Sequence, residues 1–181
     1  MKQLNTPNVL AFARVLIAPI MFWLLIDRDN FIFEGIHYSW LDLAAATLFT
    51  IAAFTDFFDG YIARAWDQKT TLGGILDPLA DKMLLLAAFL GLMMLERTSA
   101  WAIYIILVRE FFITGLRVVA ATDKKVVAAS MAGKVKTIFQ MLAAAFLIME
   151  WRPLGDVVLW IAVALTLYSG LEYTINYTKG K

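Results

Sequence analysis

Long apolar stretches separated by short polar segments dominate this sequence. Six stretches approach or exceed the roughly 20 mostly apolar residues that a membrane-spanning helix needs. They cover residues 7–26, 40–66, 72–95, 101–121, 131–150 and 154–176. Ser39, just before the second stretch, is typical of a helix N-cap. The pattern predicts an all-α integral membrane protein with six transmembrane helices, built as a single domain over residues 1–181.

The polar segments indicate which ends of the helices share a side of the membrane. Residues 27–30, 96–99 and 151–153 mark turns on one side, and residues 67–71 and 121–125 mark turns on the other. Most lysines and arginines fall with the second group, with the termini or in the adjoining helix ends. Because cytoplasmic loops are enriched in these residues, we expect both termini to be cytoplasmic.

The first apolar stretch and the tryptophans refine this topology. The N-terminal segment has polar residues at its start and lacks a small-residue cleavage site, so we expect it to remain in the protein rather than act as a removed signal peptide. Tryptophans typical of an interfacial belt, although ordinary packing would also explain them, lie near the outer helix ends: Trp40, Trp101 and Trp151.

The composition supports a membrane protein and excludes other classes. Hydrophobic residues make up 61% of the 181 residues and charged residues 17%, whereas soluble domains have about 45–50% and about 25%. The net charge of +1 gives no reason to expect a nucleic-acid partner. The chain has no cysteine, which excludes disulfides and thiolate metal sites.

Charged residues lie deep in the cytoplasmic halves of some predicted helices. Asp56 lies roughly 15 Å and Arg109 roughly 18 Å inside the ends of their helices, at a rise of ~1.5 Å per residue. An isolated charge at such depth costs at least a few kcal/mol, so we expect a polar cavity open to the cytoplasmic side. Several outer halves have no charged residue: 15–26, 43–55, 83–95 and 137–149. A cation channel or transporter would instead need acidic residues across the whole membrane.

Four aspartates are spaced to form one acidic cluster. Asp56 and Asp59 lie three residues apart, and Asp77 and Asp81 lie four apart, so each pair shares a helix face. Four carboxylates stay ionised together only if cations compensate them. Oxygen ligands without His or Cys favour Mg²⁺, Mn²⁺ or Ca²⁺, and two such ions would balance the charge. Taken alone, Asp77-Pro78 is also typical of a helix start with proline at its first position.

Residues 56–81 resemble the signature of the CDP-alcohol phosphotransferase family. The residues that match are Asp56, Asp59, Gly60, Ala63, Arg64, Gly73, Asp77 and Asp81. The resemblance implies a six-helix membrane enzyme, usually a homodimer, whose active site faces the cytoplasm. It implies that the four aspartates bind two divalent cations, Mg²⁺ or Mn²⁺, and that Asp81 is the general base for the acceptor hydroxyl. It also implies a CDP-lipid site with these residues: Asn8, Gly60, Ala63, Arg64 and Gly73.

Four basic residues indicate the acceptor. Arg109, Arg117, Lys134 and Lys136 lie on the fourth and fifth predicted helices. A phosphorylated alcohol needs such cations to hold its phosphate, whereas inositol, serine or choline would not. Alternatively, these cations pair only with Glu110 and with lipid headgroups.

The chain outside the signature resembles one branch of the same family. Residues 7–19, 109–117 and 133–137 are similar to the branch that transfers a phosphatidyl group from CDP-diacylglycerol to glycerol 3-phosphate in bacterial plasma membranes. Phe111-Phe112-Ile113 replaces smaller residues expected there, which affects packing more than chemistry. The alternatives within the family are inositol phosphate or phosphatidylglycerol as acceptor.

Overall fold

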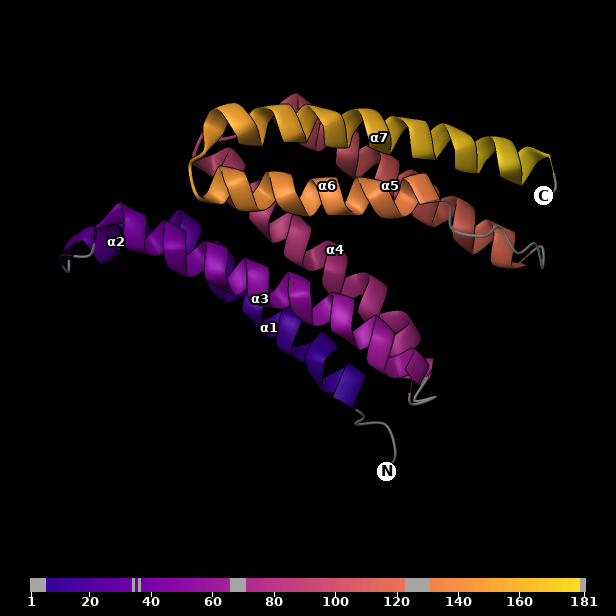
Figure 1. The fold of residues 1–181 in the computed structure, drawn as a ribbon, viewed down its shortest axis with the longest axis horizontal. Coiled ribbons are helices and arrows are strands. Elements are labelled where there is room, and N and C mark those ends of the chain that lie inside the picture. Colours follow the sequence, from indigo (N-terminus) through magenta and orange to yellow (C-terminus); the bar gives the residue numbers. More distant parts are fainter. Residues whose placement is uncertain (1–5, 34, 36, 66–70, 123–130, 180–181) are drawn as a thin grey trace.

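The described part of the chain is entirely helical. The computed structural model describes residues 6–33, 35, 37–65, 71–122 and 131–179, and these form seven helices and no strand. In chain order the helices (Figure 1) are α1 Thr6–Ile26, α2 Arg28–Phe33, α3 Tyr38–Ala65, α4 Thr71–Met94, α5 Ala100–Thr122, α6 Met131–Ile148 and α7 Arg152–Thr178. The all-α prediction is confirmed, and each of the six long helices begins and ends within two residues of its predicted range. The two predicted cytoplasmic turns fall largely on residues 66–70 and 123–130, outside the described residues.

The connection between α1 and α3 differs from the predicted turn. Residues 28–33 form the short helix α2. The carboxylate of Asp27, just before it, accepts hydrogen bonds from Asn30 Nδ2 at 2.7 Å and Trp23 Nε1 at 2.9 Å. These side-chain bonds favour a helical turn at this point, which a count of polar residues does not reveal.

The start of α3 also corrects a prediction. The helix begins at Tyr38, so Ser39 lies inside it and is not the N-cap. The backbone N–H of Ser39 donates to Nδ1 of His37 at 3.3 Å, so the imidazole of His37 caps this helix instead.

Most of the long helices carry membrane-like surfaces. Among the described residues, four stretches are long and apolar enough to cross a membrane: Val9–Ile26, Tyr38–Thr55, Met131–Ile148 and Arg152–Thr178. Helix α4 has a shorter apolar stretch, Lys82–Met94, and every 18-residue stretch of α5 contains Arg109, Glu110 and Arg117. Large apolar side chains and the predicted belt tryptophans are widely exposed, which suits lipid and not water. The chain is therefore an integral membrane protein.

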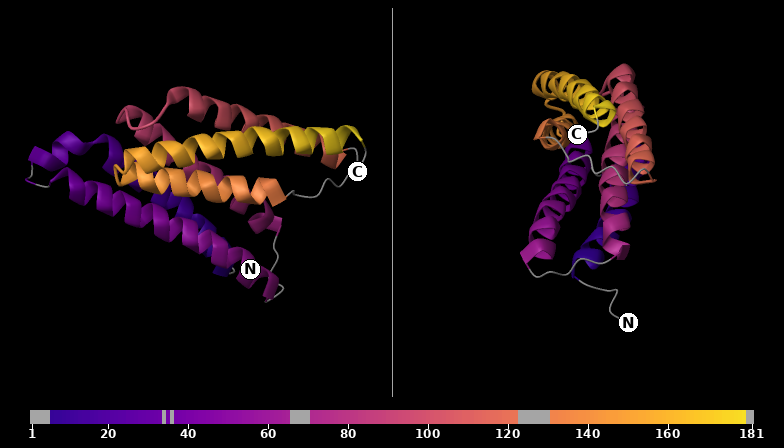
Figure 2. Two further views of the ribbon diagram at one scale, coloured as in Figure 1. Left: turned by 45° about the horizontal axis from the view of Figure 1, so that its top comes forward. Right: turned by 90° about the vertical axis from the view of Figure 1, so that its right-hand side faces the viewer.

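The helices form two groups that diverge. Helix α1 packs against α3 and α4, while α7 packs against α5 and along the length of α6. The groups lie close at the end that carries α2 and spread apart toward the other end, where α1 begins and α7 ends (Figures 1 and 2). We call the end with α2 the outer end and the opposite end the inner end.

The apolar core lies in the outer half of the bundle. Its buried residues come from six ranges: 18–25, 45–52, 84–92, 102–106, 143–148 and 158–163. Small residues allow close packing there. A Cβ on Gly91 of α4, for example, would lie 2.8 Å from Leu25 Cδ1 of α1. This location explains why four outer stretches carry no charge: 15–26, 43–55, 83–95 and 137–149.

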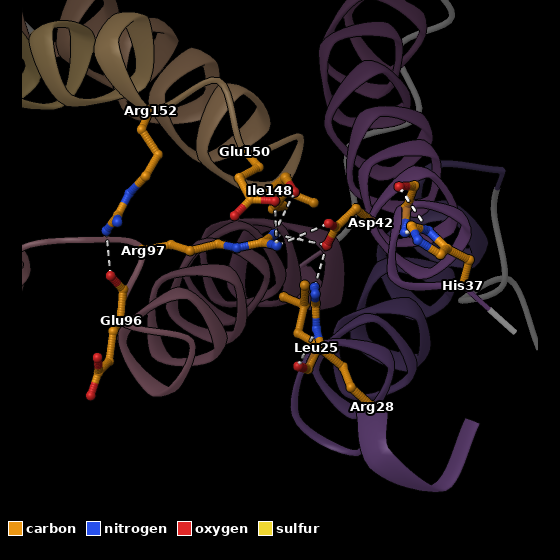
Figure 3. A network of polar contacts seen from close by, with 10 residues as sticks. Leu25, Arg28, His37, Asp42, Glu96, Arg97, Ile148, Glu150 and Arg152 are labelled. Carbon is orange, nitrogen blue, oxygen red and sulfur yellow. Dashed lines mark hydrogen bonds and ion pairs between the residues drawn. The ribbon is translucent and has the colours of Figure 1, made fainter. Parts of the chain in front are cut away.

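A buried ion network joins the connections at the outer end (Figure 3). Asp42 of α3 accepts hydrogen bonds from Arg28 of α2 and from both Nη atoms of Arg97, the latter at 2.8 and 3.0 Å. Arg97, between α4 and α5, also donates to the Ile148 carbonyl at 2.9 Å and lies 3.1 Å from Glu150 Oε2. The side chains of Arg28, Asp42 and Arg97 are each only 8% exposed. The network therefore links both groups of helices.

Two sharp helix ends support this network. Glu96 and Glu150 have positive φ angles of 54° and 61°, and in each case the next N–H donates to a carbonyl five residues back at 2.9 Å. This is the Schellman ending, a position where glycine is usual. The chain therefore turns within residues 95–99 and 149–151, which brings Arg97 and Glu150 together.

Candidate active site

Helices α3 and α4 carry the acidic signature. Residues 56–65 of α3 and residues 71–81 of α4 are helical. Asp56 and Asp59 on α3, and Asp77 and Asp81 on α4, therefore keep the spacing that places each pair on one helix face. The two helices contact each other. The side chains of all eight signature residues, and that of Asn8 in α1, lie outside the described residues.

The backbone of α4 decides between two interpretations of Asp77-Pro78. The helix begins at Thr71, so Pro78 is its eighth residue and not its first. The interpretation as a simple helix start is therefore wrong. A proline inside a helix cannot donate to the carbonyl four residues earlier, here that of Gly74. The signature thus interrupts the hydrogen bonding of its own helix.

The carboxylate oxygens of the signature aspartates are suitable ligands for a hard divalent cation. Two contacting helices each supply two carboxylates at helical spacing, and magnesium and manganese prefer such oxygen ligands. Among the side chains that the structure describes, no group of three His, Cys, Asp or Glu could hold a metal. The signature aspartates lie outside this set, and their metal role stays a prediction.

The predicted acceptor residue Arg109 lies against α7. Its side chain is 10% exposed, and its Nη2 donates to Ser169 Oγ at 2.9 Å. Gly170 leaves room for the arginine, because a Cβ there would lie 3.1 Å from Arg109 Cγ and 3.2 Å from Nε. Arg109 Nη1 donates to Glu110 Oε1 at 3.3 Å. The guanidinium is thus held from two sides, by α7 and by its own helix.

Glu110 brings two of the four predicted cations together. Its Oε1 accepts hydrogen bonds from Arg109 of α5 and from Lys136 of α6, whose side chain is 7% exposed. Arg109 and Lys136 thus do pair with Glu110, and their binding of an acceptor phosphate stays a prediction. One carboxylate between two cations still leaves one net positive charge, which an anion would compensate.

The other two predicted cations are more exposed. The guanidinium of Arg117 lies over the ring of Tyr173 of α7, 5.5 Å from its centroid, which is a cation–π distance. Lys134 is exposed at the start of α6. The structure thus brings Arg109 and Lys136 to one carboxylate. Like Arg109, Arg117 extends from α5 to a residue of α7.

A polar contact joins α4, which carries Asp77 and Asp81, to α5, which carries Arg109 and Arg117. Lys82, the residue after Asp81, donates to Thr114 Oγ1 of α5, and this hydroxyl in turn donates to the Glu110 carbonyl at 2.7 Å. Lys82 was not predicted as a site residue. Its position beside Asp81 was a signal in the sequence, but the partner helix could not be identified from it.

Three residues of α7 belong to the same cluster and were not predicted. Thr166 Oγ1 accepts a hydrogen bond from Gln140 Nε2 of α6 at 3.0 Å, and Ser169 Oγ donates to the Thr166 carbonyl at 3.1 Å. Gly170 follows directly. Small and hydroxyl residues on one face of an otherwise apolar helix indicate close helix packing in membranes. That signal was present, but it does not reveal that an arginine fills the space.

The sequence also matches known proteins over most of its length. Residues 4–168 match the profile of a family described as CDP-alcohol phosphatidyltransferase. A relative from Bacillus subtilis (strain 168) is 40% identical over 93% of each chain, and one from Rickettsia felis is 35% identical over 93% of each. A relative from Escherichia coli (strain K12) is 37% identical over 94% of this chain and 93% of its own. All three are named CDP-diacylglycerol–glycerol-3-phosphate 3-phosphatidyltransferase.

Proposed function

Because the chain belongs to the CDP-alcohol phosphatidyltransferase family, we propose that it transfers the phosphatidyl group of CDP-diacylglycerol to glycerol 3-phosphate. The products are phosphatidylglycerophosphate and CMP. The observation that carries the proposal is the near full-length similarity to relatives whose name states this donor and this acceptor. The similarity covers 93% of the chain, so it includes most of α5–α7 as well as the signature.

We propose that the six long helices cross the plasma membrane of a bacterium, with both termini and the active site on the cytoplasmic side. Two features support this orientation. Most lysines and arginines fall with the inner helix ends, the exceptions being Arg28, Arg97 and Arg152, and the apolar core and three exposed tryptophans, Trp40, Trp101 and Trp151, lie toward the outer end. A polar cavity between the diverging inner ends would hold the reacting groups, and the family resemblance implies a homodimer.

Asp56, Asp59, Asp77 and Asp81 would hold two divalent cations, Mg²⁺ or Mn²⁺. When bound, these ions would neutralise the diphosphate and the negative charge that develops on the CMP leaving group. Asn8, Gly60, Ala63, Arg64 and Gly73 would contact the CDP-lipid. The small residues in this set would let the nucleotide approach the helix backbones.

The protein's own groups would bring the acceptor to the donor. The hydroxyl oxygen of glycerol 3-phosphate forms a bond to the lipid-bearing phosphorus, and the bond from that phosphorus to the oxygen of CMP breaks. Asp81 accepts the hydroxyl proton as general base. Arg109, Arg117, Lys134 and Lys136 hold the acceptor phosphate, and Arg109 and Lys136 carry the net positive charge described above.

Acceptor specificity tests the proposal directly. The purified protein with CDP-diacylglycerol and Mg²⁺ should release CMP with glycerol 3-phosphate, and mass spectrometry should detect phosphatidylglycerophosphate. Serine, inositol, inositol phosphate and phosphatidylglycerol serve as competing acceptors. Comparable CMP release with any of these would overturn the assignment of glycerol 3-phosphate as the acceptor.

The role of Asp81 has its own test. Asp81→Asn should lower the rate of CMP release by about 100-fold or more, because general bases contribute about 10²–10⁴-fold. The exposed Asp29 of α2 provides the matched control, since Asp29→Asn should keep the wild-type rate. Full activity of the Asp81 variant would exclude Asp81 as the base.

A further inference from the structure

Arg109 has a hydrogen-bonding site that the protein fills only in part. The guanidinium carries five N–H donors. One Nη1 hydrogen goes to Glu110 and one Nη2 hydrogen to Ser169. Its Nε is buried and has no hydrogen-bond partner in the described part of the chain. Buried donors in proteins are nearly always satisfied, so an unsatisfied one points to a missing acceptor group.

Two neighbouring residues of α7 fix the direction of this guanidinium. Ser169 is 1% exposed, and its own hydroxyl hydrogen goes to the Thr166 carbonyl, so its oxygen is left to accept from Arg109. Gly170 provides the space beside Cγ and Nε of the arginine. Without these contacts the guanidinium would be free to turn fully toward Glu110, where its charge is neutralised.

We propose that Ser169 and Gly170 are positioning residues for the acceptor. They hold Arg109 partly away from Glu110, so that its remaining N–H groups face the phosphate of the acceptor alcohol. The inference rests on the proposed function, because it assumes that Arg109 binds that phosphate. It extends the acceptor site to α7, which carries none of the residues predicted from the sequence.

The first test measures the KM for both substrates in one serine variant and one glycine variant of α7. Ser169→Ala should raise the KM for glycerol 3-phosphate by about tenfold, because it removes one hydrogen bond to the charged Arg109. Gly170→Ala should also raise this KM, because the added Cβ would displace the arginine side chain. The KM for CDP-diacylglycerol should stay within about twofold of wild type, because the donor site is untouched. Unchanged acceptor KM in both variants would overturn the inference.

Two other glycines separate this effect from general damage. Gly155→Ala, at the outer end of α7, places a Cβ 2.7 Å from Leu147 Cδ2 and should lower the melting temperature without changing the acceptor KM. Gly115→Ala of α5 meets nothing within 4 Å and should change neither quantity. An acceptor KM that rises equally in the Gly155 variant would show that helix packing alone causes the effect.

A double-mutant cycle tests whether Ser169 acts through Arg109. Arg109→Lys should itself raise the acceptor KM, and Ser169→Ala should then add less than about twofold in that background. Full additivity would contradict the inference. If the wild type released no CMP with glycerol 3-phosphate, the proposed function would fail first, and that outcome is distinct from a wild-type acceptor KM in the α7 variants.

Discussion

At the scale of single residues, the four predicted cations are not equivalent. Lys136 is buried against Glu110, while Lys134, two positions earlier on α6, is exposed. A charge in a dehydrated site acts strongly on a bound anion, whereas an exposed charge is weakened by water and screened by salt. The two lysines should therefore differ in their effect on the acceptor.

Lys136→Ala should raise the KM for glycerol 3-phosphate by at least about tenfold, because it removes a buried cation from the phosphate site. Lys134→Ala should raise it by less than about threefold, and raising the salt concentration should reduce that effect. Steady-state CMP release at two salt concentrations measures both. Equal effects of the two substitutions would contradict the assignment of the buried Lys136 to the phosphate site.

At the scale of elements, one contact fixes the position of the acidic helix α4 relative to the basic helix α5. Helix α4 carries Asp77 and Asp81, α5 carries Arg109 and Glu110, and the two helices pack mainly on other neighbours. The hydrogen bond from Lys82 to Thr114 joins them. It should set the distance between the base and the phosphate of the acceptor.

Loss of this contact should slow the reaction. Lys82→Met and Thr114→Val should each lower kcat/KM by about tenfold, as expected for a hydrogen bond to a charged group. The double variant should be little worse than either single variant, because both substitutions remove the same bond. Measured kcat/KM for all four proteins gives the coupling, and strict additivity would show that Lys82 and Thr114 act separately.

The helices could be predicted from the sequence far better than the contacts between them. Apolar length predicted the bounds of the six long helices to within two residues, because a long apolar stretch is helical wherever its backbone groups must bond to one another. The short helix α2 was missed because the side chain of Asp27 stabilises it locally. The acidic signature was visible because its spacing is helical. The contribution of α7 was not visible, because Ser169 and Gly170 matter only through an arginine 60 and 61 positions earlier.

At the scale of the whole molecule, the outer ion network holds the two groups of helices at one end. Asp42 accepts from two arginines, and all three side chains are almost fully buried. Such a network is costly to break, because removing one partner leaves buried charges without compensation. Further along the bundle, where the groups diverge, the hydrogen bond from Lys82 of α4 to Thr114 of α5 also joins them.

Asp42→Asn should lower the free energy of unfolding by about 3–5 kcal/mol, the usual effect of breaking a buried ion pair. Asp29→Asn, which removes an exposed charge of α2, should change it by less than about 0.5 kcal/mol. Unfolding of both variants in the same detergent measures the difference. Equal stability of the two would show that the network contributes little.

The proposed topology can be tested because the chain has no native cysteine. Single cysteines would be placed at the outer end, by Asp29→Cys, and at the inner end, by Thr178→Cys. A membrane-impermeant maleimide should label the first variant in intact cells and the second only after the membrane is opened. Labelling of Thr178→Cys in intact cells would contradict a cytoplasmic C-terminal end.

The order in which the network residues are synthesised has a consequence for assembly in the membrane. Arg28 precedes Asp42 by 14 positions, so the carboxylate has a partner as soon as it is made. Arg97 follows 55 positions later, which is about 3–11 s at a synthesis rate of about 5–20 residues per second. Arg28 can therefore pair with Asp42 during insertion, whereas Arg97 is made just before helices α5, α6 and α7. The network closes only when both halves of the nascent protein have been inserted.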